Sequence, residues 1–200
     1  MESYFGKNGR SLWEAASGQE GSQVLKVGEK PPVKSVSSGV TAIADMENES
    51  EAGRVLISLC ADVSKHLHDM ELYANVIQLA IRTNDLAWRQ YQAKTEFPLR
   101  SVSEIYACVM RLIKNYNWEL PLRSLSVRAA EVCCDDCAVQ ADLVGSFQRH
   151  EKLEKADTAM YKVNQRYGKN TVVMASMLQK NKMPKGERIN CLPGGHNRSN

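Results

Sequence analysis

Between residues 33 and 129 the spacing of apolar residues switches between the two-residue period of a strand and the 3.6-residue period of a helix. In chain order the predicted elements are a strand (33–46), a helix after Asn48, two strands (73–83 and 87–95), a helix after Ser101 and a strand (125–129). This β-α-β-β-α-β order predicts an α+β fold, a split βαβ arrangement in which a four-stranded sheet carries two helices on one face.

Each predicted helix begins with a residue pair typical of a helix N-terminus. Asn48 with Glu51, and Ser101 with Glu104, have the spacing of a capping box. Apolar residues follow at helical spacing and are expected to pack on the sheet. They are Ala52, Val55, Leu56, Leu59, Cys60, Val63 and Leu67 in the first helix and Ile105, Cys108, Val109, Leu112, Ile113 and Tyr116 in the second. The cysteines in these two faces are expected to behave as small hydrophobic residues.

The strands alternate polar and apolar residues, so we expect one face of the sheet to lie in the core and the other in water. The polar positions expected on the open side are Gln78, Arg82, Ser124, Ser126 and Arg128. Arginine and serine together on one face favour binding of an anion. Taken singly, each is equally well explained as an ordinary solvated side chain.

Charge is segregated along the chain, although the net charge is only +3. Residues 45–71 carry seven acids and two bases, whereas residues 148–200 carry eleven bases and four acids. A basic C-terminal region indicates an anionic partner such as nucleic acid, with a merely solvated tail as the alternative. Within it, residues 153–167 have helical spacing, with a predicted apolar stripe of Leu153, Ala156, Met160, Val163 and Tyr167. Residues beyond about 180 are polar and basic and are expected to be disordered.

The N-terminus lacks a secretory signal pattern, and no apolar run is long enough to cross a membrane, so a cytoplasmic protein is expected. Its six cysteines are then expected to be free thiols. Cys134 and Cys137 have a CxxC spacing with Cys133 beside them, but a structural zinc site needs four ligands, and Cys191 and His196 are the only downstream candidates. We therefore predict no metal site, no catalytic residues and no cofactor for this chain.

Four regions resemble motifs of the Y-family, lesion-bypass DNA polymerases. We find a resemblance to the end of the thumb at 5–18 (FGKNGRSLWEAASG), to the start of the little finger at 34–38 (KSVSS), to its last strand at 118–127 (WELPLRSLSV), and to the C-terminal helix of UmuC/DinB-like proteins of Gram-positive bacteria at 152–156 (KLEKA) and 166–169 (RYGK). The family's little finger has the same β-α-β-β-α-β order.

The resemblance implies a domain organisation and a function. Residues 1–20 would be a thumb remnant, 21–33 a linker, 34–134 the little finger, 135–147 a second linker, and 148–200 a basic helix with a disordered tail. The family's little finger touches mainly DNA phosphates, so this chain would grip primer-template DNA in translesion synthesis, a part of DNA repair and the SOS response. The resemblance also implies that the Mg²⁺-binding carboxylates lie in a palm domain that residues 1–33 do not supply, so this chain alone would not polymerise.

DNA-binding residues are predicted from two sources. Arg82 and Arg128 follow from strand parity, whereas Lys34 and Ser35 follow from the resemblance; the parity of Arg89 is unclear. The full predicted set is Lys34, Ser35, Ser37, Arg82, Arg89, Ser126 and Arg128. A ligand-sensing or oligomerising split βαβ domain is the alternative, because a fold alone does not determine function.

A second partner is suggested by residues 140–144 (QADLV), which resemble the sliding-clamp peptide of these polymerases. In such a peptide a leucine enters an apolar pocket beside a hydrogen-bonded glutamine. Here Ala141 and Val144 replace larger residues of the motif, and Phe147 follows closely. The predicted clamp-binding residues are Gln140, Leu143, Val144 and Phe147, with an ordinary amphipathic linker as the alternative.

Overall fold

The computed structural model describes residues 5–6, 8–19, 21, 26–28, 32–134, 146–168, 171–178 and 182–184. They belong to two compact units, Met1–Pro32 and Val33–Asn200. The first contains α2 (Asn8–Ala16), followed by Gly18 with a φ of +71°. That left-handed conformation favours glycine and ends the helix.

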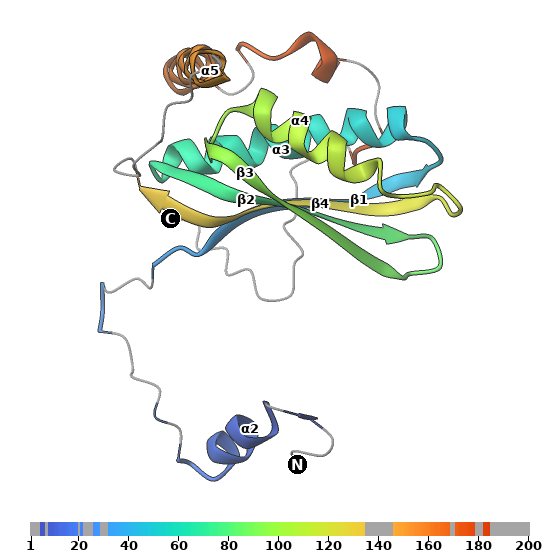
Figure 1. Cartoon of the computed structure of the whole chain (residues 1–200), viewed down its shortest axis with the longest axis vertical. Coiled ribbons are helices and arrows are strands. Elements are labelled where there is room, and N and C mark those ends of the chain that lie inside the picture. The colour runs from blue at the N-terminus through green and yellow to red at the C-terminus, as the bar shows by residue number, and fades with distance from the viewer. Residues whose placement is uncertain are drawn as a thin grey trace. The chain divides into compact units, whose positions relative to one another are not determined.

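The second unit has the predicted α+β architecture. Its elements are β1 (Ser35–Met46), α3 (Glu49–Asp69), β2 (Leu72–Thr83), β3 (Trp88–Leu99), α4 (Val102–Ile113), β4 (Leu122–Cys134), α5 (Ser146–Tyr167) and the short 3₁₀ helix η1 (Ala175–Leu178). The strands form one antiparallel sheet in the order β1-β4-β2-β3. Both α3 and α4 lie on one side of this sheet (Figure 1). Their apolar faces and the inward strand residues make a single core.

Of the two predicted N-cap residues, only Asn48 makes the expected side-chain hydrogen bond. The Asn48 side chain accepts a hydrogen bond from the Glu51 backbone N–H at 3.0 Å, which fixes the start of α3. Ser101, in contrast, makes no capping hydrogen bond at the start of α4. The Asp157 carboxylate of α5 instead accepts from the Val102 backbone N–H. A distant helix therefore supplies the cap that the local sequence predicted.

Helix α5 docks largely through polar side chains, beside the partly buried Leu153, Met160 and Val163 of its apolar stripe. His150 and Asp157 are buried, whereas Tyr167 is 66% exposed. The Glu154 carboxylate accepts from the Tyr73 hydroxyl at 2.6 Å and pairs with Arg100 at 2.7 Å. Further contacts on this side are the His150 to Glu104 hydrogen bond, the Tyr161 to Asp69 hydrogen bond, and the packing of Phe97 against Phe147 and His150. The helix predicted over residues 153–167 is confirmed, and Ala156 and Tyr167 are the exposed members of its apolar stripe.

The α5 contact makes stability depend on pH through His68, whose ring stacks on Tyr161 at 4.7 Å. Burial, with Arg100 nearby, lowers the pKa of His68 to about 4, although Glu154 and Asp69 oppose this. An unfolded histidine takes up a proton near pH 6.5, whereas the folded one does not until about pH 4. The free energy of unfolding should therefore fall by about 2 kcal/mol between these pH values. Urea titrations across this range should show a flatter profile for His68→Gln; equal profiles for the two proteins would contradict the assignment.

Two further observations differ from the sequence predictions. Part of the expected disordered tail makes defined contacts, because the Lys182 carbonyl accepts from the Ile43 backbone N–H and its ammonium pairs with Glu51 at 2.9 Å. Cys133 is disulfide-bonded, which corrects the expectation of six free thiols, whereas Cys60, Cys108 and Cys134 are free. That expectation rested on the reducing environment of the cytoplasm, which does not determine whether one particular pair of cysteines is oxidised. Among the described helices, none has the length and apolarity to span a membrane.

Candidate nucleic-acid interface

The side of the sheet away from α3 and α4 is built by strand register. Ser37 of β1 pairs with Arg128 of β4, Arg128 pairs with Gln78 of β2, and Gln78 pairs with Gln92 of β3, so these four side chains form a row across the sheet. Three further rows run parallel to it, and neighbouring rows are two residues apart along each strand. We call the four rows the open face: Ser35, Ser37, Gly39, Thr41, Ser124, Ser126, Arg128, Ala130, Val76, Gln78, Ala80, Arg82, Trp88, Gln90, Gln92 and Lys94.

All charged residues of the open face are basic: Arg82, Lys94 and Arg128. The Arg128 side chain is exposed and donates from Nε to the Ser35 hydroxyl at 3.0 Å. The Arg82 guanidinium lies 5.5 Å from the Trp88 ring centroid and donates weakly to the Leu86 carbonyl. Both guanidinium groups are thus oriented by neighbours and keep further N–H donors for a ligand.

Most of the remaining side chains of the open face are polar and uncharged. The Gln78 amide donates to Gln92 at 3.0 Å and accepts from Gln90 at 3.2 Å, so a chain of amides crosses β2 and β3. The Thr41 and Ser124 hydroxyls are hydrogen-bonded at 2.9 Å. Amides and hydroxyls donate to phosphate oxygens without adding negative charge.

The backbones of β1 and β4 approach closely at Gly39. A Cβ at this position would lie 3.0 Å from the Ser126 side chain. Ser126 therefore occupies the space that a side chain at position 39 would need. Ser38, the next residue, points the other way: it is buried and donates to Asp62 of α3. Ser126 therefore adds bulk to the open face, whereas Ser38 does not.

The predicted DNA-binding residues, with one exception, lie on or beside the open face. Lys34 is exposed immediately before β1. Arg89 is the exception, because it pairs with the buried Ile81 and its guanidinium lies 6.0 Å from the Tyr116 ring. It therefore points to the helix-covered side and is not part of the open face. Lys94 and Trp88 were missed, although both share strand parity with Gln90.

The predicted clamp-binding peptide lies largely outside the described residues. That applies to Gln140, Leu143 and Val144. Phe147 is described: it lies in the first turn of α5, half-buried, and packs edge-on against Phe97 with ring centroids 5.8 Å apart. In this structure Phe147 serves to dock α5.

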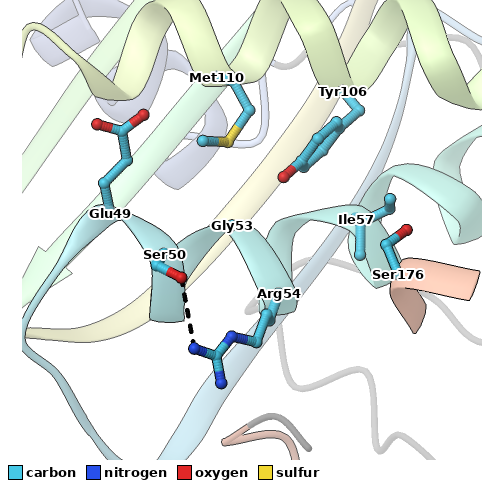
Figure 2. A pocket seen from close by; sticks show the side chains of 8 residues that line it. All are labelled: Glu49, Ser50, Gly53, Arg54, Ile57, Tyr106, Met110 and Ser176. Atoms are coloured by element: carbon cyan, nitrogen blue, oxygen red, sulfur yellow. Dashed lines mark hydrogen bonds between the residues drawn. The ribbon is translucent and has the colours of Figure 1, made fainter. Parts of the chain in front are cut away.

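A hollow of about 430 Å³ lies on the helix side of the sheet, between α3, α4 and η1. Figure 2 shows Tyr106 and Met110 of α4 directed toward α3, where Gly53 leaves room for them. The Arg54 guanidinium contacts the Ser50 hydroxyl at 3.4 Å at its rim. This hollow is separated from the open face by the sheet. Within the part of the chain that the structure describes, no group of three or more metal-ligating side chains is present.

Residues 33–143 match the impB/mucB/samB family C-terminal domain. The chain belongs to this family. It is 28% identical over 175 residues to DNA polymerase IV of Acetivibrio thermocellus, covering 87% of this chain and 44% of that protein. It is 22% identical over 180 residues to DNA polymerase IV of Clostridium acetobutylicum, covering 90% and 44%. The chain thus spans less than half the length of these relatives.

Solved structures agree on the fold. A Y-family DNA polymerase chimera, Dbh-Dpo4(243-245)-Dbh, matches with a TM-score of 0.51 and 14% identity, covering 67% of this chain and 38% of that one. The β-α-β-β-α-β sheet is therefore the little-finger fold of Y-family polymerases, and the chain corresponds to their C-terminal region.

Proposed function

We propose that the open face binds duplex DNA through its phosphates and that the chain is the DNA-gripping part of a lesion-bypass polymerase. The observation that carries this proposal is that the four paired rows of the open face hold three basic residues and no acidic one, with Glu96 of β3 exposed just beyond them. The hollow between α3, α4 and η1 lies on the other side of the sheet and is no part of this face.

Binding by phosphate contacts suits the composition of this face. Guanidinium, ammonium, amide and hydroxyl donors bind phosphate oxygens whatever the base sequence is. A polymerase that copies damaged templates must hold the duplex without testing each base. The proposed contact residues are Lys34, Ser35, Ser37, Arg82, Lys94, Ser126 and Arg128.

The complete protein would be a DNA polymerase IV-like enzyme, to judge from the named relatives. Nucleotide addition and its Mg²⁺ would belong to a palm domain, and the present chain would position the primer-template. The two clostridial relatives favour a Gram-positive type. A cytoplasmic enzyme of the SOS response is part of the same proposal.

The sliding clamp is a second proposed partner, supported by the sequence match at residues 140–144 (QADLV). The packing of Phe147 on Phe97 makes Gln140 and Leu143 the main candidate anchors.

The test is a titration of a labelled duplex with this chain at several salt concentrations. Four basic contacts, Lys34, Arg82, Lys94 and Arg128, predict that log K falls with log [salt] with a slope of about −3.6. Affinity should be similar for duplexes of different sequence. A slope near zero would contradict phosphate binding and would favour the sensor alternative.

A further inference from the structure

The docking of α5 separates its acids from its bases. Two of its three acids point inward, where Glu154 pairs with Arg100 and Asp157 caps α4. The third, Glu151, is exposed and pairs with Lys155 at 2.7 Å. Because Glu154 and Asp157 face inward, the outer side of α5 is mainly basic.

The outer side of α5 carries a regular row of bases. Its positions repeat at spacings of four and three residues and lie opposite the buried His150 and Asp157. We call the basic members, all exposed, the α5 stripe: Lys152, Lys155, Lys162 and Arg166. It extends over roughly 21 Å, from the helical rise per residue. Among the described residues, Lys152, Lys162 and Arg166 form no ion pair.

An aromatic ring stands at the end of the α5 stripe. Tyr167 is 66% exposed, and the Arg166 guanidinium lies 5.4 Å from its ring centroid. Proteins bind single-stranded nucleic acid with a row of cationic side chains beside an exposed aromatic ring. The lysine and arginine side chains contact the phosphates, and a nucleobase stacks on the ring. A membrane surface fits less well, since an interfacial helix inserts an apolar face, and the α5 stripe is interrupted only by Ala159.

The α5 stripe and the open face lie on opposite sides of the unit. Figure 1 shows the sheet, then α3 and α4, then α5. A straight duplex on the open face therefore cannot also contact α5. We propose that the α5 stripe with Tyr167 binds a single-stranded segment of nucleic acid, separate from the duplex; this rests on the proposed function of the open face.

The test compares variants of the full chain by anisotropy of labelled oligothymidylate and of a labelled duplex. Lys162→Ala/Arg166→Ala should weaken oligothymidylate binding about tenfold and make its log–log salt slope less negative by about 1.4, two contacts at about 0.7 each. Tyr167→Ala should weaken binding about fivefold with an unchanged slope, because stacking releases no counterions. Duplex affinity should change little in either variant.

The matched control is Arg111→Ala/Lys114→Ala, which removes the same charge from exposed positions at the end of α4. Equal losses in the control and the α5 stripe variant would overturn the proposal, because they would indicate diffuse attraction. The proposal would also be overturned if Lys162→Ala/Arg166→Ala lost binding to phosphatidylserine vesicles while its binding to oligothymidylate stayed intact. If the chain binds oligothymidylate but not the duplex, the proposed function of the open face is wrong and the proposal for the α5 stripe still holds.

Discussion

Replacing Arg82 and Arg128 together by alanine is expected to weaken duplex DNA binding by about thirtyfold near physiological salt. These two side chains carry two of the three positive charges of the open face, and each is oriented by a neighbour, Trp88 or Ser35. The log–log salt slope should become less negative by about 1.8, because each lost phosphate contact accounts for about 0.9. Anisotropy titrations at several salt concentrations measure both quantities.

The control for this variant lies in the same hairpin. Arg89→Ala removes the same charge as Arg82→Ala, but Arg89 pairs with Ile81 and points to the helix side. Its effect on duplex affinity should be less than about twofold, that of a distant screened charge. If Arg89→Ala weakens binding as much as Arg82→Ala, then the general field of the protein binds DNA and the open face does not.

The fold could be predicted because its signals are local. Strand β2 alternates cleanly, with Gln78 and Arg82 on one side and Ile77 and Ile81 on the other. Helices α3 and α4 carry broad apolar faces. In a sheet covered on one side, these patterns determine which residues meet the helices and which meet water.

The placement of Arg89 could not be predicted, because β3 is an edge strand with polar residues on both sides. Alternation then gives no parity, and only the pairing of Arg82 with Trp88 across the hairpin sets it. For the same reason, the sequence did not show on which face of the sheet Lys94 lies. Once the register is known, both residues are assigned without further information.

The docking of α5 was missed for a different reason. A sequence pattern treats charged residues as solvated, whereas Glu154 and Asp157 are used here to pair with Arg100 and to cap α4. Such partners are distant in sequence and are known only from the folded arrangement. Burial raises the pKa of Asp157, while the Val102 N–H opposes that rise, which is typical of a carboxylate that is enclosed but hydrogen-bonded.

Replacing Glu154 by alanine is expected to lower the free energy of unfolding by about 3 kcal/mol. The Arg100 and Glu154 side chains are only 15% and 22% exposed, and the carboxylate also accepts from Tyr73. Without it, the Arg100 guanidinium stays largely buried against the Tyr73 ring, 4.3 Å away, with its charge uncompensated. The measurement is urea unfolding followed by circular dichroism, with hydrogen exchange to locate the loss in α5.

Glu151→Ala is the matched control on the same helix. Glu151 and Lys155 form an exposed pair, 50% and 73% accessible, so its removal should change stability very little. Equal stabilities of the two variants would mean that α5 does not depend on the Glu154 contacts. Glu154→Ala should also weaken oligothymidylate binding, whereas Glu151→Ala should not. That result would mean that the docking of α5 holds the α5 stripe in place. The inward acidic side chains and the outward basic side chains of α5 would then depend on each other.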